Sequence, residues 1–126
     1  MKKWEALYTF FSSFNIPAFE ENSVPTGADK PNYPYIVYEV SQGGFNADND
    51  VELSFSIIDK SDSFVPSYQL LDTMAETIGD GKIYELDNGY MKILQGTPWG
   101  QTQREPNDNT VRRLYSIIMV TYYTSH

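Results

Sequence analysis

Residues 82–95 read KIYELDNGYMKILQ, and this segment predicts a β-hairpin. Two runs of β-forming side chains, 82–87 and 90–95, flank the pair Asn88-Gly89. Asn-Gly is the pair best suited to the positive φ angles of a type I′ turn, which joins two strands directly. The segment therefore indicates antiparallel pairing at this point of the chain.

The two faces of this predicted hairpin differ in character. With a two-residue turn at Asn88-Gly89, one face carries the apolar side chains Tyr84, Leu86, Met91 and Ile93. The other face places Glu85 opposite Lys92 and Ile83 opposite Leu94. Aliphatic side chains beside a charged pair are either incidental or part of a contact between subunits.

Upstream of the hairpin, the pattern predicts a helix over 64–79. Asp62 or Ser63 can cap its first turn, Pro66 is tolerated there, and Gly79 suits a left-handed end. The expected core stripe is Tyr68, Leu71, Met74, Ala75 and Ile78. Before it, strict alternation predicts a strand through Val51, Leu53, Phe55 and Ile57.

The N-terminal third predicts a helix, a long connection and a strand. Helix 3–14 has the apolar stripe Trp4, Leu7, Tyr8, Phe11 and Phe14, and Pro17 prevents its continuation. Residues 15–33 are rich in Pro, Gly and polar side chains, which predicts an irregular connection. Strand 35–41 follows, because β-formers alternate there with one face apolar.

Downstream of the hairpin, residues 96–110 read GTPWGQTQREPNDNT and predict a second long polar loop, which contains Trp99. Residues 111–123 are apolar on both faces, which predicts a strand in the middle of a sheet. We therefore expect one α+β domain over residues 1–126. Its mostly antiparallel sheet of about five strands packs against two helices, in the order α-β-β-α-β-β-β.

The charge of the chain argues against binding to nucleic acid. The net charge is −8, and residues 1–80 carry four Lys or Arg against 13 Asp or Glu. A surface that neutralises phosphates needs the opposite balance, so one acidic part of the surface is expected. No apolar run is long enough to predict a signal peptide or a membrane span, and we expect a soluble protein made in the cytoplasm.

The residue types argue against catalysis. The chain has no Cys, and its one histidine is the terminal His126. No glycine pattern typical of a nucleotide-binding loop occurs. Asp48, Asp50 and Glu52 cluster at the start of a strand, but they lack the spacing of a calcium loop and favour a solvated rim. We therefore expect no enzyme, no cofactor and no metal site.

Six residues are candidates for a subunit or partner interface: Trp99, Arg104, Arg112, Arg113, Ile83 and Leu94. Trp99, in a predicted loop, either anchors that loop on its own domain or fills a pocket on a partner. Arg112 and Arg113 are adjacent on a strand and so point to opposite faces. Each either pairs with the chain's own acids or docks on an acidic neighbouring subunit.

The succession of segments resembles the small tail-terminator or tail-completion proteins of long-tailed bacteriophages. The segments that carry the resemblance are FFSSFNIPAFEENSVP, YPYIVYEV, DVELSFSI, a helix ending in Gly, DNGYMKI, GTPWGQ and the long final strand. The resemblance implies a homo-oligomeric ring, hexameric in form, at the head-proximal end of the tail in the virion.

In that setting, the ring stops growth of the tail tube and contacts both the tail tube protein and the head-completion or connector protein. DNA passes through the ring without specific binding. An acidic lumen would repel the passing phosphates. Two other classes stay open: a head–tail connector or neck protein of the same particle, and a small-molecule binding domain with a deep pocket.

Overall fold

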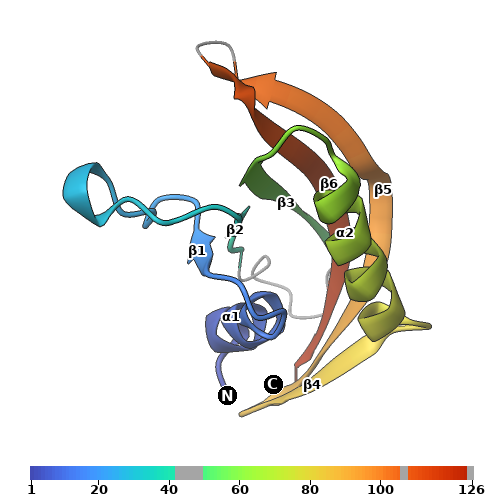
Figure 1. Cartoon of the computed structure of the whole chain (residues 1–126). Coiled ribbons are helices and arrows are strands. Elements are labelled where there is room, and N and C mark those ends of the chain that lie inside the picture. The colour runs from blue at the N-terminus through green and yellow to red at the C-terminus, as the bar shows by residue number, and fades with distance from the viewer. Residues whose placement is uncertain (42–49, 106–107, 125–126) are drawn as a thin grey trace.

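A strongly curled sheet forms the body of the structure, and both α-helices lie on its concave side (Figure 1). This computed structural model describes residues 1–41, 50–105 and 108–124, with the backbone alone at 104, 105, 109 and 124. The helices are α1 (Lys3–Ser12) and α2 (Val65–Ile78), with a short 3-10 helix at Gly27–Asp29. The strands are β1 (Ala18–Glu20), β2 (Tyr35–Tyr38), β3 (Asp50–Lys60), β4 (Lys82–Leu86), β5 (Gly89–Glu105) and β6 (Asp108–Thr124).

The sheet confirms the α+β class but corrects the expected number of strands. Within the described residues the sheet has six strands in the order β1-β2-β3-β6-β5-β4. β1 and β2 are parallel, and every other neighbouring pair is antiparallel. The additional strand β1 lies in the segment 15–33, which the sequence predicts to be irregular. Three residues are too few to show a period-2 pattern.

The main core lies between the two helices and the concave face of the sheet. The predicted alternation on β3 is confirmed, because Leu53, Phe55 and Ile57 are all buried there. The other fully buried side chains of this core come from both helices and from β2, β5 and β6: Ala6, Leu7, Phe10, Phe11, Met74, Ile36, Met91, Ile93, Leu114, Ile118, Val120 and Tyr122. The strands are thus held in place by helices on one side only.

Helix α1 buries Leu7 and Phe11 of the predicted stripe together with two residues outside it. Trp4 and Tyr8 are each 53% exposed, whereas Ala6 and Phe10 are fully buried. The helix is apolar around most of its circumference, so periodicity alone does not select a face. The helix also ends at Ser12, two residues before the predicted end at position 14.

Helix α2 confirms the prediction for 64–79 to within one residue at each end. Pro66 lies in its first turn, and Gly79 ends it with a positive φ of 53°. Met74 and Ile78 are buried as expected, but Tyr68 is 43% exposed and faces away from the core.

The hairpin of β4 and β5 forms, with a register shifted by two residues from the predicted one. Leu86 pairs with Gly89, so Glu85 lies opposite Tyr90 and Ile83 opposite Lys92. A tertiary contact lies at this turn. The Asp87 carboxylate binds the N-terminal ammonium group, and the Asp87 backbone N–H donates to the carbonyl of Met1 at 3.0 Å.

A shift of two residues leaves every side chain on its predicted face. Leu86, Met91 and Ile93 are buried, and Ile83 is 58% exposed. The prediction of the two faces is therefore confirmed, and the prediction of the facing pairs is wrong.

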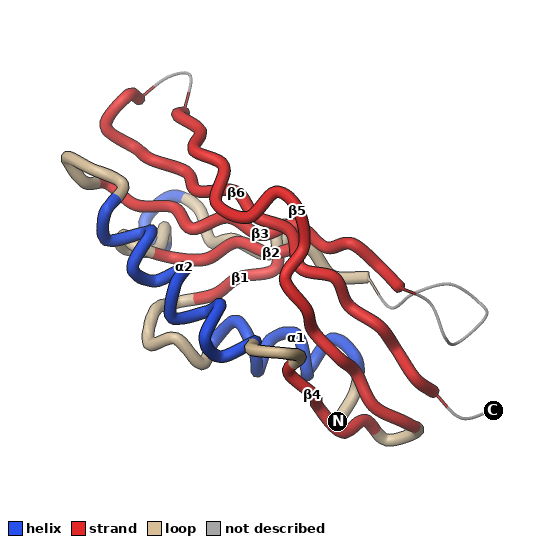
Figure 2. The backbone as a smooth tube through the Cα atoms, turned by 90° about the vertical axis from the view of Figure 1, so that its right-hand side faces the viewer, coloured by secondary structure: helices blue, strands red, loops and turns tan. Residues whose placement is uncertain are grey.

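The predicted loop 96–110 is wrong, because β5 continues to Glu105 and β6 begins at Asp108. Figure 2 shows β5 and β6 running together along the molecule, with β4 beside only the lower part of β5. Pro98 and Gly100 lie beyond the part of β5 that pairs with β4. Among the described residues no strand pairs with the other edge of β5 at this point, and such edges tolerate Pro. The pairing with β6 shifts register on both sides of Trp99, and the Gly100 N–H donates to Ser116 Oγ at 2.9 Å.

Candidate interaction surfaces

The convex face of the sheet, opposite the helices, is called the outer face here. Alternation along the strands places Ile83, Leu94 and Arg113 on it, and places Trp99 and Arg112 on the concave side. The structure describes Arg104 through its backbone alone, in β5 opposite Arg112. The predicted interface residues are thus divided between two faces.

Trp99 anchors its own domain. Its ring lies 5.8 Å from the ring of Phe55, centroid to centroid, in a T-shaped arrangement, and its side chain is half-buried against the main core. Edge-to-face aromatic pairs of this kind add to the stability of a core. Of the two roles open to Trp99 in the sequence, the structure shows the intramolecular one.

Arg112 binds the segment that precedes α2. Its Nε donates to the carbonyl of Ser61 at 2.7 Å and its guanidinium donates to the carbonyl of Asp62 at 3.0 Å. The guanidinium also lies 5.2 Å from the ring centroid of Phe64. These partners are backbone carbonyls and not the chain's own carboxylates, which were one of the two alternatives that the sequence left open. Arg113, on the next position of β6, points to the opposite face, as predicted.

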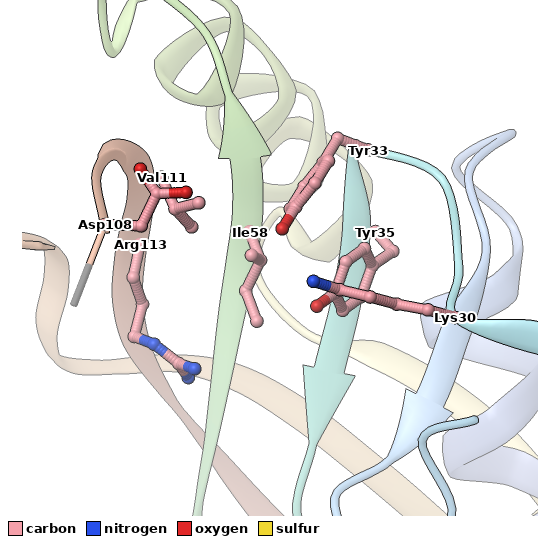
Figure 3. Close-up of a pocket in the computed structure, with 7 residues that line it drawn as sticks. All are labelled: Lys30, Tyr33, Tyr35, Ile58, Asp108, Val111 and Arg113. Atoms are coloured by element: carbon pink, nitrogen blue, oxygen red, sulfur yellow. The ribbon is translucent and has the colours of Figure 1, made fainter. Parts of the chain in front are cut away.

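A groove of about 340 Å³ lies on the outer face where Arg113 projects (Figure 3). Its floor is apolar and consists of Tyr35, Ile58 and Val111, which are all buried. Lys30 and Tyr33 form one wall, from the connection between β1 and β2. The opposite wall is formed by Asp108 and Arg113, from β6.

Two cations border this groove. Figure 3 shows the Lys30 side chain reaching across Tyr35 towards Ile58, with Arg113 on the far wall. A hydrogen bond with Tyr33 is the main cause that raises the pKa of Lys30, so the ammonium group stays charged. Hydrogen bonds from Thr110 lower the pKa of Asp108, with a smaller contribution from Lys60, whose Nζ lies 3.9 Å from the carboxylate.

A second groove, of about 280 Å³, adjoins the first and shares Arg113. It follows β2, β3 and β6 along the outer face, and its wall includes Glu39 and Tyr115. The Glu39 carboxylate accepts hydrogen bonds from the backbone N–H of Ser54 at 2.7 Å and from the Ser54 hydroxyl at 2.5 Å. The two grooves share Arg113, and the second one is lined by two carboxylates, those of Glu21 and Glu39.

Exposed apolar side chains gather on the outer face at the other edge of the sheet. Ile83 is 58% exposed, Tyr90 is 42% exposed and Tyr123 is 38% exposed. Tyr90 and Tyr123 face each other across β5 and β6, and their rings stack with centroids 4.5 Å apart. Leu94 is half-buried beside them. Within the described residues neither α-helix covers this part of the sheet.

The described residues contain no group of three or more His, Asp or Glu side chains able to hold a metal ion. Asp50 and Glu52 are exposed, and Asp50 accepts a hydrogen bond from the Thr121 hydroxyl at 2.5 Å. Asp48 and His126 lie outside the described residues. Across the same described part of the chain, no helix is long and apolar enough to cross a membrane.

Lys30, Tyr33 and Ile58 were not among the sequence-predicted interface residues. The sequence signal for Lys30 and Tyr33 is the length of the connection 15–33, because connections of more than about 12–15 residues without regular structure are commonly functional. Ile58 lies in β3 and has no such signal. Comparison of the chain with protein-family models, with curated proteins and with solved structures finds no match.

Proposed function

We propose that this chain is a structural subunit that assembles with copies of itself into a ring. The ring acts as a tail terminator of a long-tailed bacteriophage. It is made in the host cytoplasm and placed in the virion at the head-proximal end of the tail. There it contacts the tail tube protein on one side and the head-completion or connector protein on the other.

The observation that carries the assembly part of this proposal is the bare apolar area on the outer face. Contiguous exposed apolar side chains are costly on a monomer and commonly mark surfaces that another protein covers. Ile83, Tyr90 and Tyr123 contribute exposed apolar area from three adjacent strands, with Lys92 opposite Ile83 and Glu85 opposite Tyr90. The tail-terminator part of the proposal rests on the resemblance of the sequence segments.

The acidic surface has a place in the same proposal. Asp72, Glu76 and Asp80 are exposed along and just after α2, and no Lys or Arg occurs between Lys60 and Lys82. We call these three exposed acids the acidic ridge. If the acidic ridge lines the lumen of the ring, it repels the phosphates of DNA in transit, so that the lumen does not bind the DNA. A ring structure with a neutral or basic lumen would contradict this assignment of the ridge.

The proposal is tested by the mass of the purified full-length protein in solution and by negative-stain images, both alone and after addition of isolated tail tubes. We expect closed rings, formed either by the protein alone or at the ends of the tubes. A protein that stays monomeric and leaves tube ends uncapped would overturn the proposal.

A further inference from the structure

The most exposed large apolar side chain among the described residues lies on an edge strand. Ile83 is 58% exposed, and Glu85, two residues further along β4, is exposed on the same face. β4 pairs with β5 on one side only, at the end of the sheet order. This edge therefore presents an apolar side chain followed by a carboxylate.

The groove bordered by Lys30 and Arg113 has the complementary character. Its floor of Tyr35, Ile58 and Val111 is apolar, and its border carries two cations against one carboxylate, that of Asp108. An aliphatic side chain fits such a floor, and a carboxylate two residues away along an extended strand fits a cation at the border. Charge complementarity of this kind favours one orientation of a docked strand.

The two surfaces lie far apart on one chain. The groove spans β2, β3 and β6, whereas β4 is the opposite edge strand of the sheet. The curl of the sheet also turns the outer face in different directions at these two places (Figure 1). One copy can therefore offer its β4 edge to one neighbour and its groove to another.

We propose that the β4 edge of one copy docks into the groove of the next copy, with Ile83 on the floor formed by Tyr35, Ile58 and Val111. Glu85 of the first copy then faces Lys30 and Arg113 of the second. Because the two contacting surfaces differ, the contact is heterologous and repeats around a ring when the rotation closes. This inference rests on the proposed function, for which it supplies the contact between subunits.

Introduced cysteines test this contact directly, since the chain contains no Cys. An Ile83→Cys protein is mixed with a Tyr33→Cys protein under mild oxidation, and products are separated on a non-reducing gel. The control replaces Ile83→Cys with Val65→Cys, because Val65 is similarly exposed, at 54%, on α2. We expect a disulfide-linked pair for the first mixture at several times the yield of the control. Equal yields would overturn the inference.

A chain carrying both Ile83→Cys and Tyr33→Cys separates failure of the contact from failure of the ring. Closed covalent oligomers that end at one size support both the contact and the ring. A ladder of products without a largest size supports the contact and contradicts the closed ring. Closed rings of wild-type protein, combined with no cross-linking above control, contradict the contact and leave the ring intact.

Charge exchange provides an independent test. We expect Glu85→Lys and Lys30→Glu each to weaken self-association by about two- to fivefold, as for a bordering ion pair. Mixing the two variants restores association, because each then offers the other a complementary surface. Glu76→Lys is the matched control, an exposed acid on α2 outside both surfaces. If the mixture of the two variants does not regain self-association, the assigned pairing of Glu85 with Lys30 is overturned.

Discussion

The two faces of the sheet differ in how completely they are covered. On the concave face, side chains from α1 and α2 bury the strands, as at Phe55 and Met91. On the outer face, the connection between β1 and β2 covers one end with Val24 and Tyr33, and the edge at Ile83 stays bare. Substitutions on the two faces should therefore act on different properties: the concave face on stability, and the outer face on association.

The largest expected effect is the loss of a side chain from the concave core. Phe55 is 1% exposed and its ring contacts Phe11, with centroids 5.3 Å apart, as well as Trp99. Phe55→Ala leaves a cavity there and should lower the free energy of unfolding by about 3–5 kcal/mol. Denaturant unfolding followed by circular dichroism measures this loss. A decrease below about 1 kcal/mol would show that the concave core does not control stability.

The next largest loss of stability is expected for Trp99→Ala. This variant tests whether Trp99 acts on stability or on association. From the sequence alone, a partner role for Trp99 predicts intact folding with loss of assembly. The contact with Phe55 instead predicts a loss of about 2–3 kcal/mol in the free energy of unfolding, since the ring is half-buried. Thermal unfolding of the variant distinguishes the two. A wild-type unfolding temperature would restore the partner role.

A smaller loss is expected at the irregular part of β5. The hydroxyl of the buried Ser116 accepts the Gly100 N–H, so Ser116→Ala leaves that N–H without its partner. The expected cost is about 1–2 kcal/mol. Urea unfolding of the variant and of the wild type measures it. A neutral result would mean that another group satisfies Gly100.

Alkaline pH should weaken the concave core without effect near neutrality. Burial raises the pKa of Tyr38 and the pKa of Tyr122 to about 12. In the unfolded chain a tyrosine has a pKa of about 10. Between that pH and about 12 the unfolded chain loses its tyrosine protons while the folded chain keeps them, so the free energy of unfolding falls as the pH rises. Thermal unfolding across that range should show the decline. Tyr122→Phe should show a shallower one.

Several features of the fold were predictable because local chemistry specifies them. The alternation through Leu53 and Phe55 defines β3, and Pro66 and Gly79 mark the ends of α2. The two faces of the hairpin follow from the alternation of side chains along a strand, which a register shift of two residues does not change. These signals come from residues adjacent in sequence.

Other features depend on contacts between distant residues, which sequence patterns do not carry. Asp87 contacts the N-terminal residue at the hairpin turn, and Pro98 lies within β5 at a register shift in the pairing with β6. The groove is formed by Tyr33 and Lys30 lying over strands that are paired through the fold. Its apolar floor is therefore visible only in three dimensions.

The smallest expected effect on stability belongs to Ile83→Asp, and this variant tests the account most directly. An exposed outer-face substitution should change the free energy of unfolding by no more than about 0.5 kcal/mol. Light scattering, or negative-stain images of tube ends if the wild type assembles only there, should show assembly of the wild type and of the control Val65→Asp. Ile83→Asp should stay at the 14.4 kDa mass of one chain and leave the tube ends uncapped. An Ile83→Asp protein that assembles like the wild type would contradict the central claim that the bare outer face joins the subunits.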